Sequence, residues 1–152
     1  MGAAAQLQVG LAQEPFDPYR LLEGWRGQES GAAESVFVGR VRPTTASGDS
    51  LAALELQHYA GMAERQLHQL ARAAAEQHGA CAVLVHHRVG RIAPGEAIVL
   101  VAVVADRRGP AQRCCQALLE ALKHHAPFWK REWRADGSSS WVIGNTAYGE
   151  AS

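Results

Sequence analysis

The chain has 152 residues, 47% of them hydrophobic and 20% charged, and its fifteen Lys and Arg residues balance fifteen Asp and Glu residues. This length and composition predict a single globular domain over residues 1–152 that buries a core of its own. A net charge of zero argues against a dedicated nucleic-acid binder, which needs a strong basic excess. The longest strongly apolar run, "AIVLVAVVA", is too short to span a membrane.

The first half of the chain predicts three strands and a short helix. Weak alternation over 7–16 is typical of an edge strand, and 18–27 has the pattern of a short helix. The segments 34–42 and 51–59 are rich in residues that favour strands. Between them, the Pro, Thr, Ser, Gly and Asp residues of 43–50 predict a mobile loop.

The second half continues with two longer helices. Apolar residues at helical spacing predict a helix over 61–80 that stops at Gly79, and a second helix that starts near Pro110 and ends at Pro127. The expected strands are 81–90, 96–105, 128–134 and 138–143. The strand at 96–105 is apolar on both faces, so we expect it at the centre of a sheet. The order predicts an α+β fold with a mostly antiparallel sheet, two main packed helices and a loose C-terminal tail.

Cysteine and histidine usage gives no sign of a redox or metal centre. Cys81, Cys114 and Cys115 form no C-x-x-C motif, and no secretory signal is visible, so we expect reduced core thiols in a cytoplasmic protein. The histidines lack metal-binding spacing. His86 and His87, for example, are neighbours in a predicted strand and are expected on opposite faces.

The stretch "ALKHHAPFWKREW", residues 121–133, places Lys123 and Lys130 on either side of Pro127. On its helix, Lys123 falls at the margin of the buried stripe, where a lysine can bury its stem and direct its amine along the surface. Pro127 then turns the chain into a strand that carries Lys130. The two amines are therefore expected to converge on one cleft, the alternative being two solvated edges.

Further cations are available to such a cleft. Arg40 and Arg42 are two apart in a predicted strand and are expected on one face. Arg107 and Arg108 precede the second long helix, whose N-terminus is a favourable place for an anionic group. Together these side chains predict a site for a small molecule that carries a phosphate. Nearby positive charge also lowers the pKa of a lysine and thereby prepares it for base or nucleophile chemistry.

Four motifs in this order identify a family. They are "FVGRVR", "LELQHYAGMAE", "HRVGRIAPGEAIVLVAV" and "APFWKRE". With them, the chain resembles the large, catalytic subunit of molybdopterin synthase over roughly residues 35–142. The resemblance implies an α/β hammerhead-type fold with an added antiparallel sheet. It also implies a sulfurtransferase of molybdenum cofactor biosynthesis that works in the cytoplasm.

The implied reaction converts cyclic pyranopterin monophosphate into molybdopterin by adding two sulfurs as a dithiolene. The sulfur comes from the C-terminal thiocarboxylate of a small ubiquitin-like partner subunit, whose tail enters a pocket of the large subunit. Two large subunits form a homodimer, with one small subunit at each end of the heterotetramer. No metal or organic cofactor is implied for the transfer itself.

The resemblance also assigns site residues by position. Lys123 matches the essential lysine of the family and Lys130 the lysine beside the partner's tail and the substrate. Three further matches are implied to bind substrate: Phe37, Arg42 and Arg108.

Arg107 departs from the family, which usually has histidine there. An arginine still binds phosphate, but it does not move a proton because it stays charged. Any arginine that relatives contribute from their C-terminal tail has no evident match after Arg134. One alternative function is therefore a catalytically weakened relative that still binds the small subunit. Another is single-strand RNA binding by the basic, aromatic stretch "HHAPFWKREWR", which the neutral net charge opposes.

Overall fold

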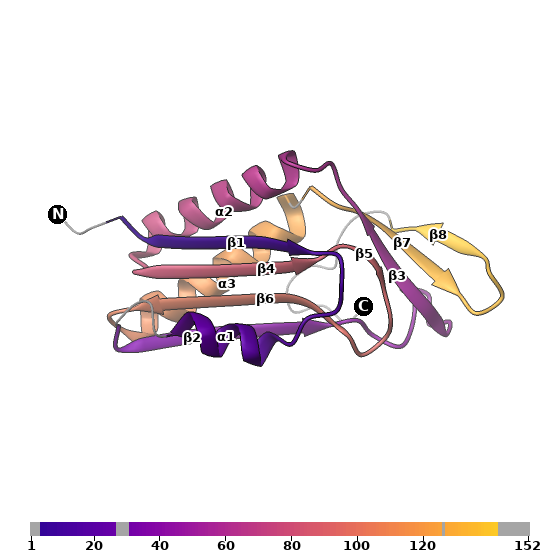
Figure 1. Ribbon diagram of the computed structural model, residues 1–152, viewed down its shortest axis with the longest axis horizontal. Helices are drawn as coiled ribbons and strands as arrows, with labels where there is room; N and C mark the ends of the chain where they lie inside the picture. Colours follow the sequence, from indigo (N-terminus) through magenta and orange to yellow (C-terminus); the bar gives the residue numbers. More distant parts are fainter. Residues whose placement is uncertain (1–3, 27–30, 126, 143–152) are drawn as a thin grey trace.

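The computed structural model describes residues 4–26, 31–125 and 127–142. The predicted loose tail from residue 143 lies outside these ranges. The elements follow in the order β1 (Gln6–Ala12), α1 (Pro18–Arg26), β2 (Ala33–Arg40), β3 (Leu51–Gln57), α2 (Met62–His78), β4 (Ala82–Arg88), β5 (Gly90–Ile92), β6 (Ala97–Ala105), α3 (Arg108–His125), β7 (Trp129–Arg134) and β8 (Ser139–Trp141) (Figure 1). The predicted α+β class is confirmed. None of the helices in the described ranges is long and apolar enough to cross a membrane.

The larger of two sheets has the strand order β1–β4–β6–β2. Strand β6 is central, as predicted, and all of its residues except Ile98 are buried. Strand β1 is an edge strand, also as predicted, and pairs in parallel with β4. The remaining pairs in this sheet are antiparallel, so the prediction of a mostly antiparallel sheet is confirmed.

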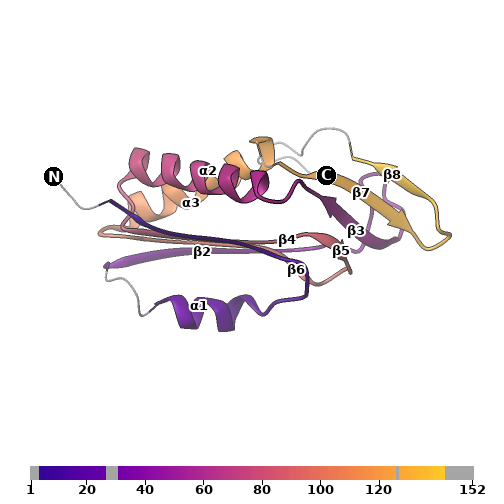
Figure 2. The same ribbon diagram turned by 45° about the horizontal axis from the view of Figure 1, so that its top comes forward.

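Helices cover both faces of this sheet. The two long helices, α2 and α3, lie on one face and the short α1 lies on the other (Figure 2). Five of the six residues of the stripe predicted for α3 are buried, namely Ala111, Cys114, Cys115, Leu118 and Leu122. The sixth, Leu119, is half-buried, and the stripe packs against valines of β4 and β6. Helix α3 begins at Arg108, two residues before the predicted start at Pro110. The predicted stop of α2 is confirmed, because Gly79 caps the helix in the left-handed conformation with φ 70°.

The second sheet lies beyond one end of the first and has the order β5–β3–β7–β8, with every pair antiparallel (Figure 1). The single strand predicted over 81–90 is wrong. Strand β4 ends at Arg88 in the larger sheet, and β5 begins at Gly90 in the second. Gly90 has a φ of 81°, which a residue with a side chain rarely adopts, and this conformation turns the chain from one sheet to the other.

Candidate active site

A cavity of about 510 Å³ lies where the two sheets meet the C-terminal end of α3. Its wall combines the end of β2, the segment after it, β3, β6, the last turns of α3 and β7. Apolar side chains form much of it, including Leu51, Leu54, Ile98, Leu122 and Phe128. Segments that are far apart in the sequence therefore meet at the cavity. A few charged side chains project into it from a wall that is otherwise largely apolar.

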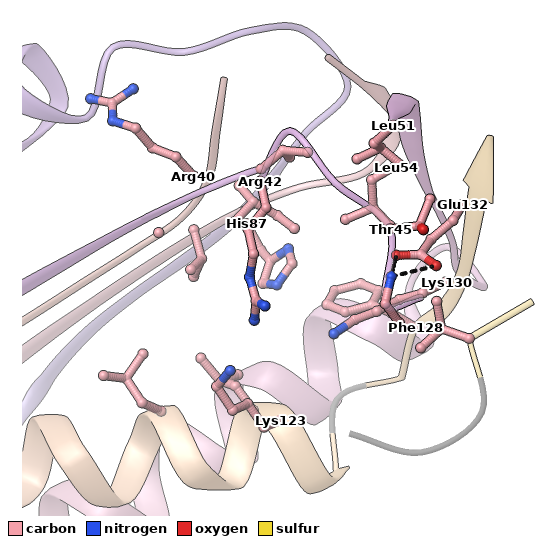
Figure 3. Close-up of a pocket in the computed structure, with 18 of the residues that line it drawn as sticks. Arg40, Arg42, Thr45, Leu51, Leu54, His87, Lys123, Phe128, Lys130 and Glu132 are labelled. Carbon is pink, nitrogen blue, oxygen red and sulfur yellow. Dashed lines mark hydrogen bonds between the residues drawn. The ribbon is translucent and has the colours of Figure 1, made fainter. Parts of the chain in front are cut away.

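Lys123 reaches the cavity from the last turn of α3, directly after the buried Leu122. This is the flank position that the helical spacing predicts. Lys130 comes from the opposite side, on β7, where it pairs in register with Leu56 of β3. Figure 3 shows both side chains pointing into the same cavity. The predicted convergence of the two amines is confirmed, and their chemical roles stay a prediction.

The surroundings of Lys130 favour its uncharged form. Burial in the cavity wall, followed by the positive charges of Lys123 and Arg42, lowers the pKa of the Lys130 amine below its ordinary value. A lowered pKa increases the fraction of neutral amine near neutral pH. Neutral amine is the form that accepts a proton or attacks an acyl carbon.

Arg42 and Phe37 also line the cavity, as the family resemblance implies. Arg42 follows the end of β2 and points toward Lys123, whereas Arg40 points away from both (Figure 3) and donates from Nη1 to the Gly95 carbonyl at 3.2 Å. The expectation that both arginines share a face is therefore wrong. Strand β2 ends at Arg40, so the period of two that holds within a strand does not extend to Arg42.

Arg107 and Arg108 do not reach this cavity. They lie at the start of α3, and a helix of 18 residues is about 27 Å long. Neither residue belongs to the lining of the cavity. The expectation that they share one cleft with Lys123 is wrong for a single chain, because the predicted sites lie at opposite ends of the same helix.

Two polar lining residues, His87 and Glu132, are not among the site residues that the sequence predicts. Glu132 is two residues after Lys130 on β7, so the strand period places it on the same face, a signal that was available. Its carboxylate oxygens accept from the Ala46 backbone N–H at 3.3 and 3.1 Å, which ties the segment after β2 to β7 (Figure 3). His87 has no comparable local signal.

The cysteines have the expected setting. None of the three forms a disulfide within the described ranges; Cys114 and Cys115 are buried and Cys81 is half-buried. Burial, and next the neighbouring Cys115, raises the pKa of Cys114 to about 11, so this thiol is a poor nucleophile. Within the described ranges, no group of three or more His, Cys, Asp or Glu side chains is arranged to hold a metal ion.

Known proteins are similar to this chain in both sequence and fold. The sequence profile of the MoaE protein family matches residues 11–125. A protein from Rhizobium meliloti named molybdopterin synthase catalytic subunit is 43% identical over 146 residues, which are 95% of this chain and 92% of the relative.

Two solved structures are also similar over nearly their whole length. The molybdopterin biosynthesis MoaE protein from Burkholderia ambifaria has a TM-score of 0.75 and 35% identity, with 95% of this chain and 93% of that chain covered. The molybdopterin synthase from Staphylococcus aureus has a TM-score of 0.72 and 28% identity, with 94% and 99% covered. From the match to the profile, the identity to relatives and the common fold, we conclude that this chain belongs to the MoaE protein family.

Proposed function

We propose that this chain is the catalytic subunit of a molybdopterin synthase that acts in the cytoplasm. In this reaction, sulfur passes from the C-terminal thiocarboxylate of a small ubiquitin-like partner to cyclic pyranopterin monophosphate and forms the dithiolene of molybdopterin. The observation that carries the proposal is the meeting of Arg42, Lys123 and Lys130 in one cavity. The membership of the MoaE family and the names of the relatives support it.

The cavity offers what the reaction needs. A cyclic phosphate needs cations, and Arg42 supplies a planar guanidinium that suits phosphate oxygens. The acyl carbon of a thiocarboxylate and the protons of the pterin need an amine that changes its protonation state, and the lowered pKa of Lys130 favours this. Apolar walls limit access of water, which strengthens each of these interactions. Whether Lys123 acts as nucleophile or as acid and base is open in this proposal.

In a homodimer, Arg107 and Arg108 of one copy could reach the cavity of the other. Strand β2 is an edge of the larger sheet, and its large apolar residues Val36 and Phe37 are 42% and 39% exposed. Phe37 also lines the cavity. A second copy along β2 would cover these side chains and would lie beside the cavity. We propose that the two arginines serve the cavity of that second copy, with one small partner subunit bound at each end of the assembly.

Arg107 is the observation that favours a second candidate, a relative that binds the small subunit without turnover. If the histidine that the family usually has at this position moves a proton, an arginine cannot replace it in that role, because it binds anions but holds its charge. The two candidates share the docking of the partner tail and differ only in chemistry.

Single-turnover sulfur transfer tests these proposals. The protein is mixed with the thiocarboxylated small subunit and cyclic pyranopterin monophosphate, and dithiolene product is quantified. We expect product with the natural sequence and its loss in Lys123→Ala. Arg113→Ala, which removes an exposed cation from the same helix, is the matched control and should keep its activity. Product only in Arg107→His would favour the second candidate, and no product in any variant would contradict the synthase.

A further inference from the structure

His87 is a buried histidine in the wall of the cavity. It lies near the end of β4, two residues after Val85 and four after Val83, and therefore on the face that packs against α2 and α3. Its side chain is 7% exposed and forms part of the cavity lining. Figure 3 shows its ring between Arg42 and Phe128. His86 lies on the opposite face, against Phe16, as the strand period predicts.

The hydrogen bond of this ring fixes its tautomer. Nδ1 of His87 lies 2.9 Å from the backbone carbonyl oxygen of Arg88. Because a carbonyl oxygen only accepts, Nδ1 carries the hydrogen, and Nε2 of the neutral ring has a free lone pair. Phe128 packs on the ring with 4.4 Å between centroids and 39° between planes. Packing and hydrogen bond together hold the ring in one orientation.

The ring is uncharged at neutral pH. Burial, followed by the charges of Lys130 and His86 and against the effect of the Arg88 carbonyl, lowers the pKa of His87 to about 4. The ring is therefore an acceptor at physiological pH. Within the described part of the chain, Nε2 makes no hydrogen bond, and the residue lines the cavity.

Nε2 of His87 adds an acceptor beside the cations of this cavity. Arg42, Lys123 and Lys130 have only donors in their charged forms. Glu132 is a further acceptor, on β7, and its oxygens receive the Ala46 N–H. A ligand that brings only anionic oxygens would match the cations and leave Nε2 unpaired. A ligand that also brings an N–H group would satisfy both.

We propose that Nε2 of His87 binds an N–H donor of the substrate, so that the cavity selects an anionic small molecule that also carries a nitrogen heterocycle or amino group. The inference rests on the proposed function, where this donor is an N–H group of the pterin. Because an unpaired buried acceptor is costly, His87 would discriminate against phosphate compounds that lack such a donor. His87 is thus a substrate-binding residue in addition to the cations.

Two substitutions separate the two ring nitrogens. In His87→Asn, the amide nitrogen reaches the position of Nδ1 and keeps the bond to the Arg88 carbonyl, while the acceptor at Nε2 is lost. In His87→Gln, the amide oxygen reaches the position of Nε2 and keeps the acceptor. Calorimetry then measures the Kd of cyclic pyranopterin monophosphate without the small subunit, so that no turnover occurs. We expect His87→Asn to weaken binding about tenfold and His87→Gln to stay within about threefold of the natural protein.

Inorganic sulfate is the matched probe, because at neutral pH it carries neither an N–H nor an O–H donor. Its Kd should be the same in the natural protein and in His87→Asn, which shows that the cations keep their places. Circular dichroism and thermal unfolding establish that each variant is folded, and the ¹⁵N chemical shifts of the imidazole report the Nδ1–H tautomer. An unchanged pterin Kd in His87→Asn, or equal weakening in both variants, would overturn the inference.

The same samples separate this inference from the proposed function. Sulfur transfer by the natural protein together with an unchanged Kd in His87→Asn would overturn the inference alone. A pterin Kd that depends on His87 without any sulfur transfer would support the inference and contradict the synthase. No pterin binding by the natural protein would overturn both.

Discussion

Lys130 and Arg131 are neighbours on β7 and have opposite surroundings. Lys130 faces the cavity, where burial and two other cations lower its pKa. Arg131 faces the outer side of the second sheet, where its guanidinium stacks on Trp133 at 4.7 Å and on Trp141 at 4.9 Å. Strand alternation alone separates them. One cation is destabilised in a site and the other is stabilised by aromatic rings, so adjacent positive charges serve different purposes.

The comparison extends along the strand. Glu132, on the face of Lys130, ties the segment after β2 across the cavity. On the other face, the Trp133 indole N–H donates to Glu55 at 2.8 Å, and Arg91 covers the same indole ring at 4.1 Å. The cavity face thus holds groups that are poised to meet a ligand, whereas the outer face pairs its charged and aromatic groups with one another. Substitutions on the two faces should therefore affect different properties.

Among the residues of β7, the largest effect is expected at Lys130. If its amine moves a proton or attacks the thiocarboxylate, Lys130→Ala should lower the single-turnover rate by about 10²- to 10⁴-fold. Lys130→Arg keeps the positive charge but cannot release a proton near neutral pH, so its single-turnover rate should also be low. The measurement is dithiolene formation under single-turnover conditions. Full activity of Lys130→Arg would mean that only the positive charge matters and would break the contrast with Arg131.

The pH dependence tests the cause of the lowered pKa. A reaction that needs neutral Lys130 accelerates as pH rises toward the pKa of that amine and then levels off. Arg42 is one of the two charges that lower this pKa, so Arg42→Ala should move the ascending limb to higher pH. Arg131→Ala, on the outer face, is the control and should leave the limb where it is. An equal shift in both variants would contradict the assignment to the cavity.

A second effect concerns stability and His87. In the unfolded chain His87 binds a proton near its ordinary pKa of 6.5, whereas in the folded protein it does so only at about 4. Between these values the unfolded state holds more protons, so the free energy of unfolding falls as pH decreases. The contribution of His87 is about 3 kcal/mol at most. Urea unfolding from pH 7 to pH 4 should show a shallower decline in His87→Asn than in the natural protein.

The exposed His125→Asn is the matched control for this experiment, because its ring is not enclosed by the cavity wall. It should show the same decline as the natural protein. If His87→Asn also kept the full decline, the buried ring would not be the source of the pH dependence, and the neutral acceptor in the cavity would lose its support.

Arg107 and Arg108 lie at the start of α3, away from β7. Dimers that combine two different variants would show whether these arginines act in the cavity of their own chain or in that of the second copy. We expect Arg108→Ala to lower the rate about tenfold, as loss of a charge-assisted contact does. Mixing it with Lys123→Ala should restore activity, because one cavity of each mixed dimer then has both residues. Random exchange makes about a quarter of all cavities intact. No recovery, despite mixed dimers detected by mass spectrometry, would contradict service across the dimer.

Sequence patterns predicted the elements whose signal is local. The structure contains the predicted strand β6, buried on both faces, and the predicted buried stripe of α3. Both were predictable because a strand buried on two faces and a helix buried on one face leave different patterns of apolar residues in the sequence. The meeting of Lys123 and Lys130 was also predictable, since Pro127 reverses the chain between them. In each case the decisive residues lie within about twenty positions of one another.

The failures involve contacts over longer range or irregular backbone. Arg107 was grouped with Lys123 by charge, although the length of α3 separates them. The period of two places Arg40 and Arg42 on one face, but β2 ends at Arg40 and the period does not extend to Arg42. His87 was considered for metal binding only, because nothing local shows that its Nδ1 meets a carbonyl while Phe128 packs on its ring. The corner at Gly90 likewise depends on a second sheet that forms from distant strands.

The smallest effect is expected at Arg131, and it is the sharpest test of the outer face. Arg131→Ala removes the cation from two indole rings, which should lower the free energy of unfolding by about 1 kcal/mol. Arg131→Lys keeps the charge without the planar stacking group and should recover only part of this loss. Sulfur transfer should be unchanged in both, because the side chain points away from the cavity. The exposed Arg113→Ala on α3 should change unfolding by less than about 0.5 kcal/mol. If Arg131→Ala instead slowed sulfur transfer as Lys130→Ala does, the outer face would take part in the reaction, for example by binding the small subunit. The division of β7 into a reactive face and a structural face would then be wrong.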